Sequence, residues 1–189
     1  IPANPDLAER ARPQEPPQRA PRRLDFADPR VAQPYVMRSY LAPERDAGAQ
    51  EEAAALTLLA QLLGGDSRSS LMNRVLEVEE QSALYAAAFY DGKSLDDTTF
   101  GILVVPTPGR NLEQAEADID RMIARFLEEG IDSELLERIK MQARAQEIYD
   151  RDDLQGLARR YGTALTSGLT VADVEAWPDI LQSVTEDDI

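Results

Sequence analysis

Residues 53–90 read AAALTLLAQLLGGDSRSSLMNRVLEVEEQSALYAAAFY and contain the most informative pattern of the chain. In the first part of this stretch, Leu56, Leu59 and Leu63 recur at spacings of three and four, the period of one helix face. This spacing predicts a helix over 51–63. Gly64 and Gly65 follow directly and are expected to end it.

The second part of the stretch predicts a helix and then a strand. A helix over 69–80 would carry Leu71, Val75 and Val78 on one face. The run 82–90 is expected to be a strand, with Tyr85, Ala87 and Phe89 on one side and the alternate residues Leu84, Ala86, Ala88 and Tyr90 on the other. A turn-rich segment then leads to a second strand over 98–105. The short connection favours an antiparallel pair.

Upstream of this stretch the chain is rich in proline. Nine of its twelve prolines precede residue 44, and residues 1–30 hold six arginines and five acidic residues. Because proline excludes a helix or a central strand there, residues 1–30 are expected to be an extended linker from an upstream domain. Val31 to Leu41 follows as a predicted strand, which Pro34 would place at a sheet edge.

Downstream, the chain is helical in pattern almost throughout. Capping signals and apolar spacings predict helices over 111–130, 133–148, 154–167 and from 170 until Pro178 interrupts the last one. Thr185 to Asp188 has the form of another helix start, so the domain 31–189 is expected to be truncated at its end. The order of elements predicts an α+β fold, an antiparallel sheet with helices packed on one face.

Composition excludes several kinds of chemistry. Histidine and cysteine are absent, so this chain offers neither the usual zinc ligands nor a histidine-activated nucleophile. A net charge of −15 argues against nucleic acid as a partner, and no apolar run is long enough to span a membrane. The glycine pair at 64–65 follows a helix instead of preceding one, so it is not expected to bind phosphate. The acidic cluster at 150–153 lacks the glycine and the final glutamate of a calcium loop, and the acidic pair at 96–97 is expected to lie in a solvated turn. We therefore predict no catalytic and no metal-binding residue here.

The order of motifs nevertheless resembles a known family. The helix ending in Gly-Gly, the turn, Ser69-Ser70-Leu71 and then Val-Glu-Glu-Gln-Ser-Ala-Leu-Tyr before a strand are similar to the pitrilysin/insulinase family of zinc peptidases, which includes the mitochondrial processing peptidase. Further matches are the strand ending in Arg38-Ser39-Tyr40-Leu41-Ala42-Pro43, the strand end at Pro106, and Tyr161-Gly162. The chain resembles the second domain of that family, which lacks the zinc motif, from about Arg30 to its end.

The resemblance implies a role in binding peptide. In the family, two related domains enclose a chamber, and the zinc lies in the first domain, so zinc is expected in an N-terminal domain of the same chain or of a partner chain. Many members hold the substrate with an arginine and, seven residues later, a tyrosine. Tyr85 matches the tyrosine, but Val78 stands at the arginine position. Arg74, four residues earlier, would face the same side of a regular helix and could substitute. An exposed Arg74 and a Tyr85 packed within the sheet remain the alternative.

Two functions follow from the resemblance. The chain is either the non-catalytic C-terminal domain of a zinc metalloendopeptidase, shaping the chamber for a peptide substrate, or an inactive structural or partner-binding subunit. Both allow a homo- or heterodimer. Val78 in place of arginine favours the second function slightly. Bacterial members of the family are often periplasmic, so the resemblance suggests that compartment.

Overall fold

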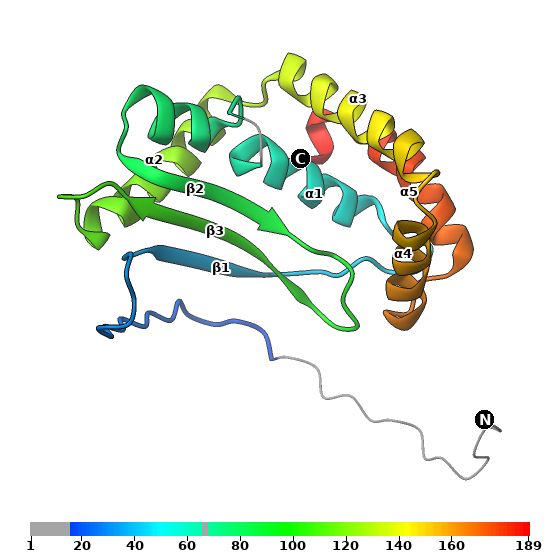
Figure 1. Cartoon of the computed structure of the whole chain (residues 1–189), viewed down its shortest axis with the longest axis horizontal. Coiled ribbons are helices and arrows are strands. Elements are labelled where there is room, and N and C mark those ends of the chain that lie inside the picture. The colour runs from blue at the N-terminus through cyan, green and yellow to red at the C-terminus, as the bar shows by residue number, and fades with distance from the viewer. Residues whose placement is uncertain (1–15, 66–67) are drawn as a thin grey trace, which may run out of the picture.

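The computed structural model describes residues 16–65 and 68–189. The first half of the expected linker therefore lies outside the described residues, and residues 16–35 contain no helix or strand. In Figure 1 this segment turns back below the sheet. The side chain of Arg23 within it forms an ion pair with Glu116. Among the residues described, no helix is both long enough and apolar enough to cross a bilayer.

Three antiparallel strands form the sheet in the order β1-β3-β2, with β1 at Val36–Ala42, β2 at Ala83–Tyr90 and β3 at Thr98–Pro106. The predicted pairing of the two later strands is confirmed, and β1 lies at an edge as expected. The prediction that the first strand starts at Val31 is wrong. Val31 closes a turn with Asp28, and Pro34 has no N–H to donate to a ladder, so pairing begins only at Val36.

Helices cover one face of this sheet, as predicted. They are α1 (Glu51–Gly64), the π-helix η1 (Asn73–Glu79) and α2 (Leu112–Glu129). Their buried side chains pack with those of the strands in one core: Ala60, Leu63, Val75, Leu76, Ala86, Ala88, Phe100, Ile102, Val104, Ile119 and Met122. This core fixes which face of the sheet is left uncovered.

A second layer of helices packs on the outer side of α1 (Figure 1). Leu58 and Leu62 of α1 contact side chains of α3 (Ser133–Asp150) and α5 (Val171–Ser183). Because α1 is buried from two sides, its sequence is apolar nearly all round rather than amphipathic. Helix α4 (Leu154–Thr166) packs against α5, and a short 3₁₀ turn, η2 (Glu186–Asp188), follows.

Two of the predicted helices differ in form. The second helix is π-helical, with i→i+5 bonds such as Glu80 N–H to Val75 O at 2.9 Å, and this wider turn leaves Val78 52% exposed instead of on the buried face. Pro178 does not interrupt α5. Pro178 has no backbone N–H to donate to the Val174 carbonyl, which instead accepts a hydrogen bond from the Arg160 guanidinium at 3.4 Å.

Candidate functional site

Among the described residues, none covers the face of the sheet turned away from the helices, and the strand residues on that face carry no charged side chain. We call it the open face; it consists of the outward residues of the three strands, Met37, Ser39, Leu41, Tyr85, Ala87, Phe89, Thr99, Gly101, Leu103 and Val105. Met37 is 51% exposed, Tyr85 49%, Leu41 43% and Phe89 40%. In a chain with net charge −15, a contiguous uncharged and largely apolar surface is typical of a binding face.

Register places the open-face residues in rows across the sheet. Ala87 pairs with Leu103, which pairs with Met37 on its other side. Phe89 lies opposite Gly101, where an added Cβ would come within 2.2 Å of the Phe89 ring. The absence of a side chain at Gly101 therefore lets the Phe89 ring lie across β3, which keeps the open face flat at this point.

Tyr85 lies on the open face, directly after an irregularity in the strand. The pairing of β2 with β3 shifts between Ala83 and Tyr85, which is the signature of a β-bulge. The predicted alternation is confirmed from Tyr85 to Tyr90 but is wrong for Leu84. That side chain is 50% exposed, and Ala83 takes the core position instead.

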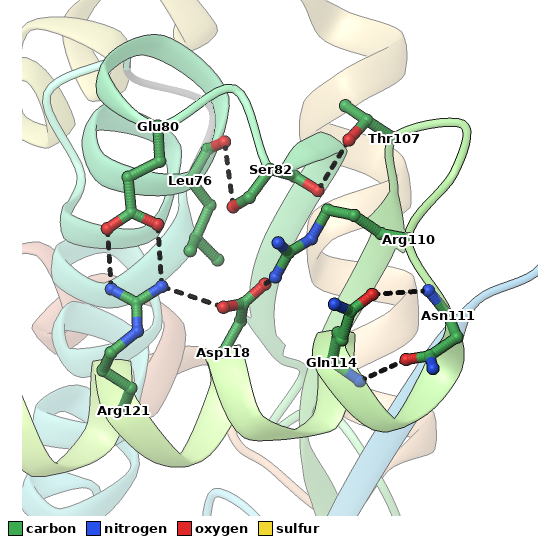
Figure 2. Close-up of polar contacts among 9 residues, drawn as sticks. All are labelled: Leu76, Glu80, Ser82, Thr107, Arg110, Asn111, Gln114, Asp118 and Arg121. Atoms are coloured by element: carbon green, nitrogen blue, oxygen red, sulfur yellow. Dashed lines mark hydrogen bonds and ion pairs between the residues drawn. The ribbon is translucent and has the colours of Figure 1, made fainter.

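A charge network holds the segment that leads into β2 (Figure 2). The buried carboxylate of Asp118 on α2 accepts hydrogen bonds from Arg110 at 2.6 Å and from Arg121 at 2.8 Å. Arg121 also donates two bonds to Glu80, at 2.8 and 2.7 Å. The pKa of the Arg121 guanidinium is raised because it donates hydrogen bonds to the carboxylates of Glu80 and, to a smaller extent, Asp118. The network thus joins α2 to the end of η1.

The turn between η1 and β2 contains a residue in a left-handed conformation and is held by two hydrogen bonds from Thr107. Gln81 adopts a left-handed backbone conformation with φ of 52°. The Ser82 carbonyl accepts hydrogen bonds from both the backbone N–H and the hydroxyl of Thr107, at 3.0 and 3.2 Å, which ties the start of β2 to the end of β3 (Figure 2). Sequence reasoning missed this network. The only signal was the i,i+3 spacing of Asp118 and Arg121 on α2.

Arg74 is placed differently from Tyr85. It is exposed on η1 and lines a small cavity of about 50 Å³ between η1 and the α2–α3 connection, next to Phe126, Glu129 and Asp132. Within the described residues, no hydrogen bond or ion pair joins Arg74 to the chain segment around Tyr85. The structure therefore does not bring the two predicted site residues into contact.

Among the residues that the structure describes, no set of side chains fits a zinc ion. Without histidine or cysteine, only carboxylates could serve, and they are not the ligands that zinc prefers. Within the described part of the chain, no three acidic residues cluster closely enough to hold a metal. The carboxylates of the site are engaged instead by arginines, as at Asp118.

Comparison with solved structures identifies related folds. A protease from Helicobacter pylori is similar over 82% of this chain, with a TM-score of 0.72 and 18% identity. The inactive peptidase domain of a candidate zinc protease from Bordetella parapertussis is similar over 84%, with a TM-score of 0.68 and 18% identity. The periplasmic protease PqqL from Escherichia coli is similar over 82%, with a TM-score of 0.58 and 17% identity. At these identities the likeness establishes the fold alone.

The lengths of these proteins show what share of each corresponds to this chain. The chain covers 84% of the Bordetella domain, but 36% of the Helicobacter protease and 16% of PqqL. No curated protein sequence matches it. The sequence model of one family, described as the peptidase M16 inactive domain, matches residues 1–143, which is more than half of the chain. This chain therefore belongs to the family of peptidase M16 inactive domains.

Proposed function

We propose that the chain is the non-catalytic C-terminal domain of a zinc metalloendopeptidase, and that its open face forms part of the wall of a peptide-binding chamber. The observation that carries the proposal is the uncharged open face, on which Met37, Leu41, Tyr85 and Phe89 are each about half exposed. An unfolded peptide offers apolar side chains and backbone groups, which such a surface can bind without sequence specificity. Tyr85, which is 49% exposed on the edge strand β2, adds a hydroxyl that can form hydrogen bonds.

Zinc and the catalytic groups would come from an N-terminal domain of the same chain or of a partner chain, in a homo- or heterodimer. Membership of an inactive-domain family and the lack of zinc ligands in this chain support this division of labour. The proposed compartment is the bacterial periplasm, supported by the fold similarity to PqqL.

The test uses the intact protein that contains the zinc domain. Tyr85→Phe is expected to lower kcat/KM for an unstructured peptide several-fold while leaving the melting temperature nearly unchanged, because it removes only the hydroxyl of a half-exposed residue. Arg74→Ala tests whether that arginine assists, and Tyr149→Phe, which removes a hydroxyl from a tyrosine 74% exposed on α3, is the matched control. Full activity of Tyr85→Phe would reduce Tyr85 to a structural residue.

A second candidate function is that of an inactive, partner-binding subunit, favoured by Val78 at the arginine position of the family pattern. It predicts an intact protein that hydrolyses no peptide at saturating zinc, yet binds one. Zinc-dependent turnover would exclude it.

A further inference from the structure

A second hollow lies between the β2–β3 turn and helices α3, α4 and α5. Its volume is about 600 Å³, within the range of small-molecule sites. The wall is mixed: Trp177, Val174 and Leu181 supply apolar surface, and Arg45, Lys93 and Arg144 supply positive charge. Neither the charge network of Figure 2 nor the open face contributes to it.

Arg45 is the unusual member of this wall. It is only 6% exposed, and its guanidinium lies over the Trp177 ring at 3.8 Å from the centroid. Its Nε donates to the Gln50 side-chain oxygen at 2.6 Å, and Nη2 donates to the Asp173 backbone carbonyl at 3.1 Å. In the described structure Nη1 has no acceptor, and no carboxylate forms an ion pair with Arg45. Burying a cation whose hydrogen-bond acceptors are all neutral costs free energy, and a bound anion lowers that cost.

The acids near Arg45 are engaged elsewhere. The Asp173 carboxylate accepts from the Thr170 hydroxyl and backbone N–H and from the Gly48 N–H, and it receives only a weak contact from Gln50. Glu147 forms an ion pair with Arg160, the second cation near Arg45. Burial, and then the positive charge of Arg160, lower the pKa of Arg45 to about 10 and outweigh the negative charge of Asp173, which acts in the opposite direction.

The geometry points to a binding site for a carboxylate that carries an apolar group, with Arg45 as the principal anion contact and Trp177, Val174 and Leu181 around the apolar part. A planar carboxylate matches the donors of a guanidinium. A monoanion fits better than phosphate because Asp91, Glu147 and Asp150 also line the cavity and would repel a dianion. Lys93 lies at the rim of the cavity near Arg45, because the backbone N–H of Arg45 donates a hydrogen bond to the carbonyl of Gly92 at 2.8 Å. The site stands apart from the proposed proteolytic role and needs no zinc domain.

Trp177 is the single tryptophan of the chain, so its emission reports directly on the cavity. We would titrate this chain with N-acetyl-leucine, whose carboxylate is at the chain terminus, and with N-acetyl-leucinamide, which has none. N-acetyl-glutamic acid α-amide tests an acidic side chain as the source of the carboxylate, and inorganic phosphate tests a simple anion. The expected result is a saturable change with at least one carboxylate ligand and at least tenfold weaker binding of the amide and of phosphate.

Variants assign the contact to Arg45. Arg45→Gln should weaken carboxylate binding at least tenfold, while Arg138→Gln, an exposed arginine on α3 outside the cavity, should leave it unchanged. If Arg45→Gln does not fold, the rim double variant Lys93→Ala/Arg144→Ala decides, with an expected loss of about threefold or more. Equal affinity for acid and amide, tighter binding of phosphate, no saturable response, or unchanged affinity in the folded variants would each overturn the proposal.

Discussion

Gly64→Ala tests how closely the helical layer approaches the strand that carries Tyr85 and Phe89. A Cβ at position 64 would lie 2.4 Å from the backbone nitrogen of Ala88 and 2.8 Å from the carbonyl carbon of Ala87. The first distance is about 1 Å short of an ordinary contact of about 3.5 Å, and neither atom belongs to a side chain that could rotate away. Helix α1 and strand β2 must therefore separate.

The cost follows from the packing that such a shift disturbs. Overpacking of a core typically costs about 1–3 kcal/mol, and alanine in place of glycine at a helix end recovers less than about 1 kcal/mol. We expect Gly64→Ala to lower the free energy of unfolding by about 2 kcal/mol, measured by urea denaturation of the 189-residue chain.

The matched control is Gly162→Ala in α4. That glycine has an ordinary helical φ and nothing within 4 Å of the added Cβ. Alanine there should stabilise the chain by up to about 1 kcal/mol. The opposite signs at the two glycines are the prediction. Unchanged or raised stability of Gly64→Ala would refute the close approach of α1 to β2.

Three further outcomes are expected. Asp118→Ala should lower the free energy of unfolding by about 2 kcal/mol, which is less than the roughly 3–5 kcal/mol typical of a broken buried ion pair, because Arg110 and Arg121 are partly exposed and can be hydrated. Glu80→Gln at the outer end of the network should cost less than about 1 kcal/mol. The pKa of Asp173 is lowered chiefly by the Thr170 hydroxyl, then by the backbone N–H groups of Thr170 and Gly48. The ionised carboxylate therefore stabilises the fold above about pH 4, the unfolded pKa, and this stabilisation is lost as pH falls through the lower folded pKa. Asp173→Asn should be less stable than the parent at pH 7, and the difference in free energy of unfolding should shrink at pH 3; a constant difference would contradict this. The chain alone should neither bind stoichiometric zinc, measured by metal analysis after dialysis, nor cleave peptides with zinc added; turnover abolished by a chelator would defeat that prediction.

The sequence predicted the elements that depend on local pattern. The Asn111–Gln114 capping box, the end of α2 at Gly130 and the hairpin of β2 with β3 are where periodicity and turn chemistry indicate them. Gly64 was predicted only as a helix stop. Its role in close packing depends on a strand more than twenty residues away, which no local pattern reveals.

Features set by tertiary contacts escaped sequence reasoning. The π-helical turns of η1 and the bulge before Tyr85 each shift a side chain by one position, and neither has a local signal in the residues concerned. Pro178 is accommodated inside α5, where Arg160 on another helix donates a hydrogen bond to the Val174 carbonyl that proline leaves without its helical donor. The open face could be predicted in part, because alternation assigned Tyr85 and Phe89 to it. The cavity at Arg45 could not, because its wall is assembled from six separate segments.

Site-specific photo-crosslinking of a bound peptide in the intact protein tests whether the open face binds peptide. A photoreactive phenylalanine analogue would replace Phe89, which is 40% exposed on the open face, or Leu127, which is 78% exposed on α2. The zinc domain would be made inactive so that an unstructured peptide is bound without being cleaved. We expect strong crosslinking from position 89, which an excess of unlabelled peptide suppresses, and only background crosslinking from position 127. Equal labelling from the two positions, or labelling from position 127 alone, would contradict a peptide-binding role for the open face.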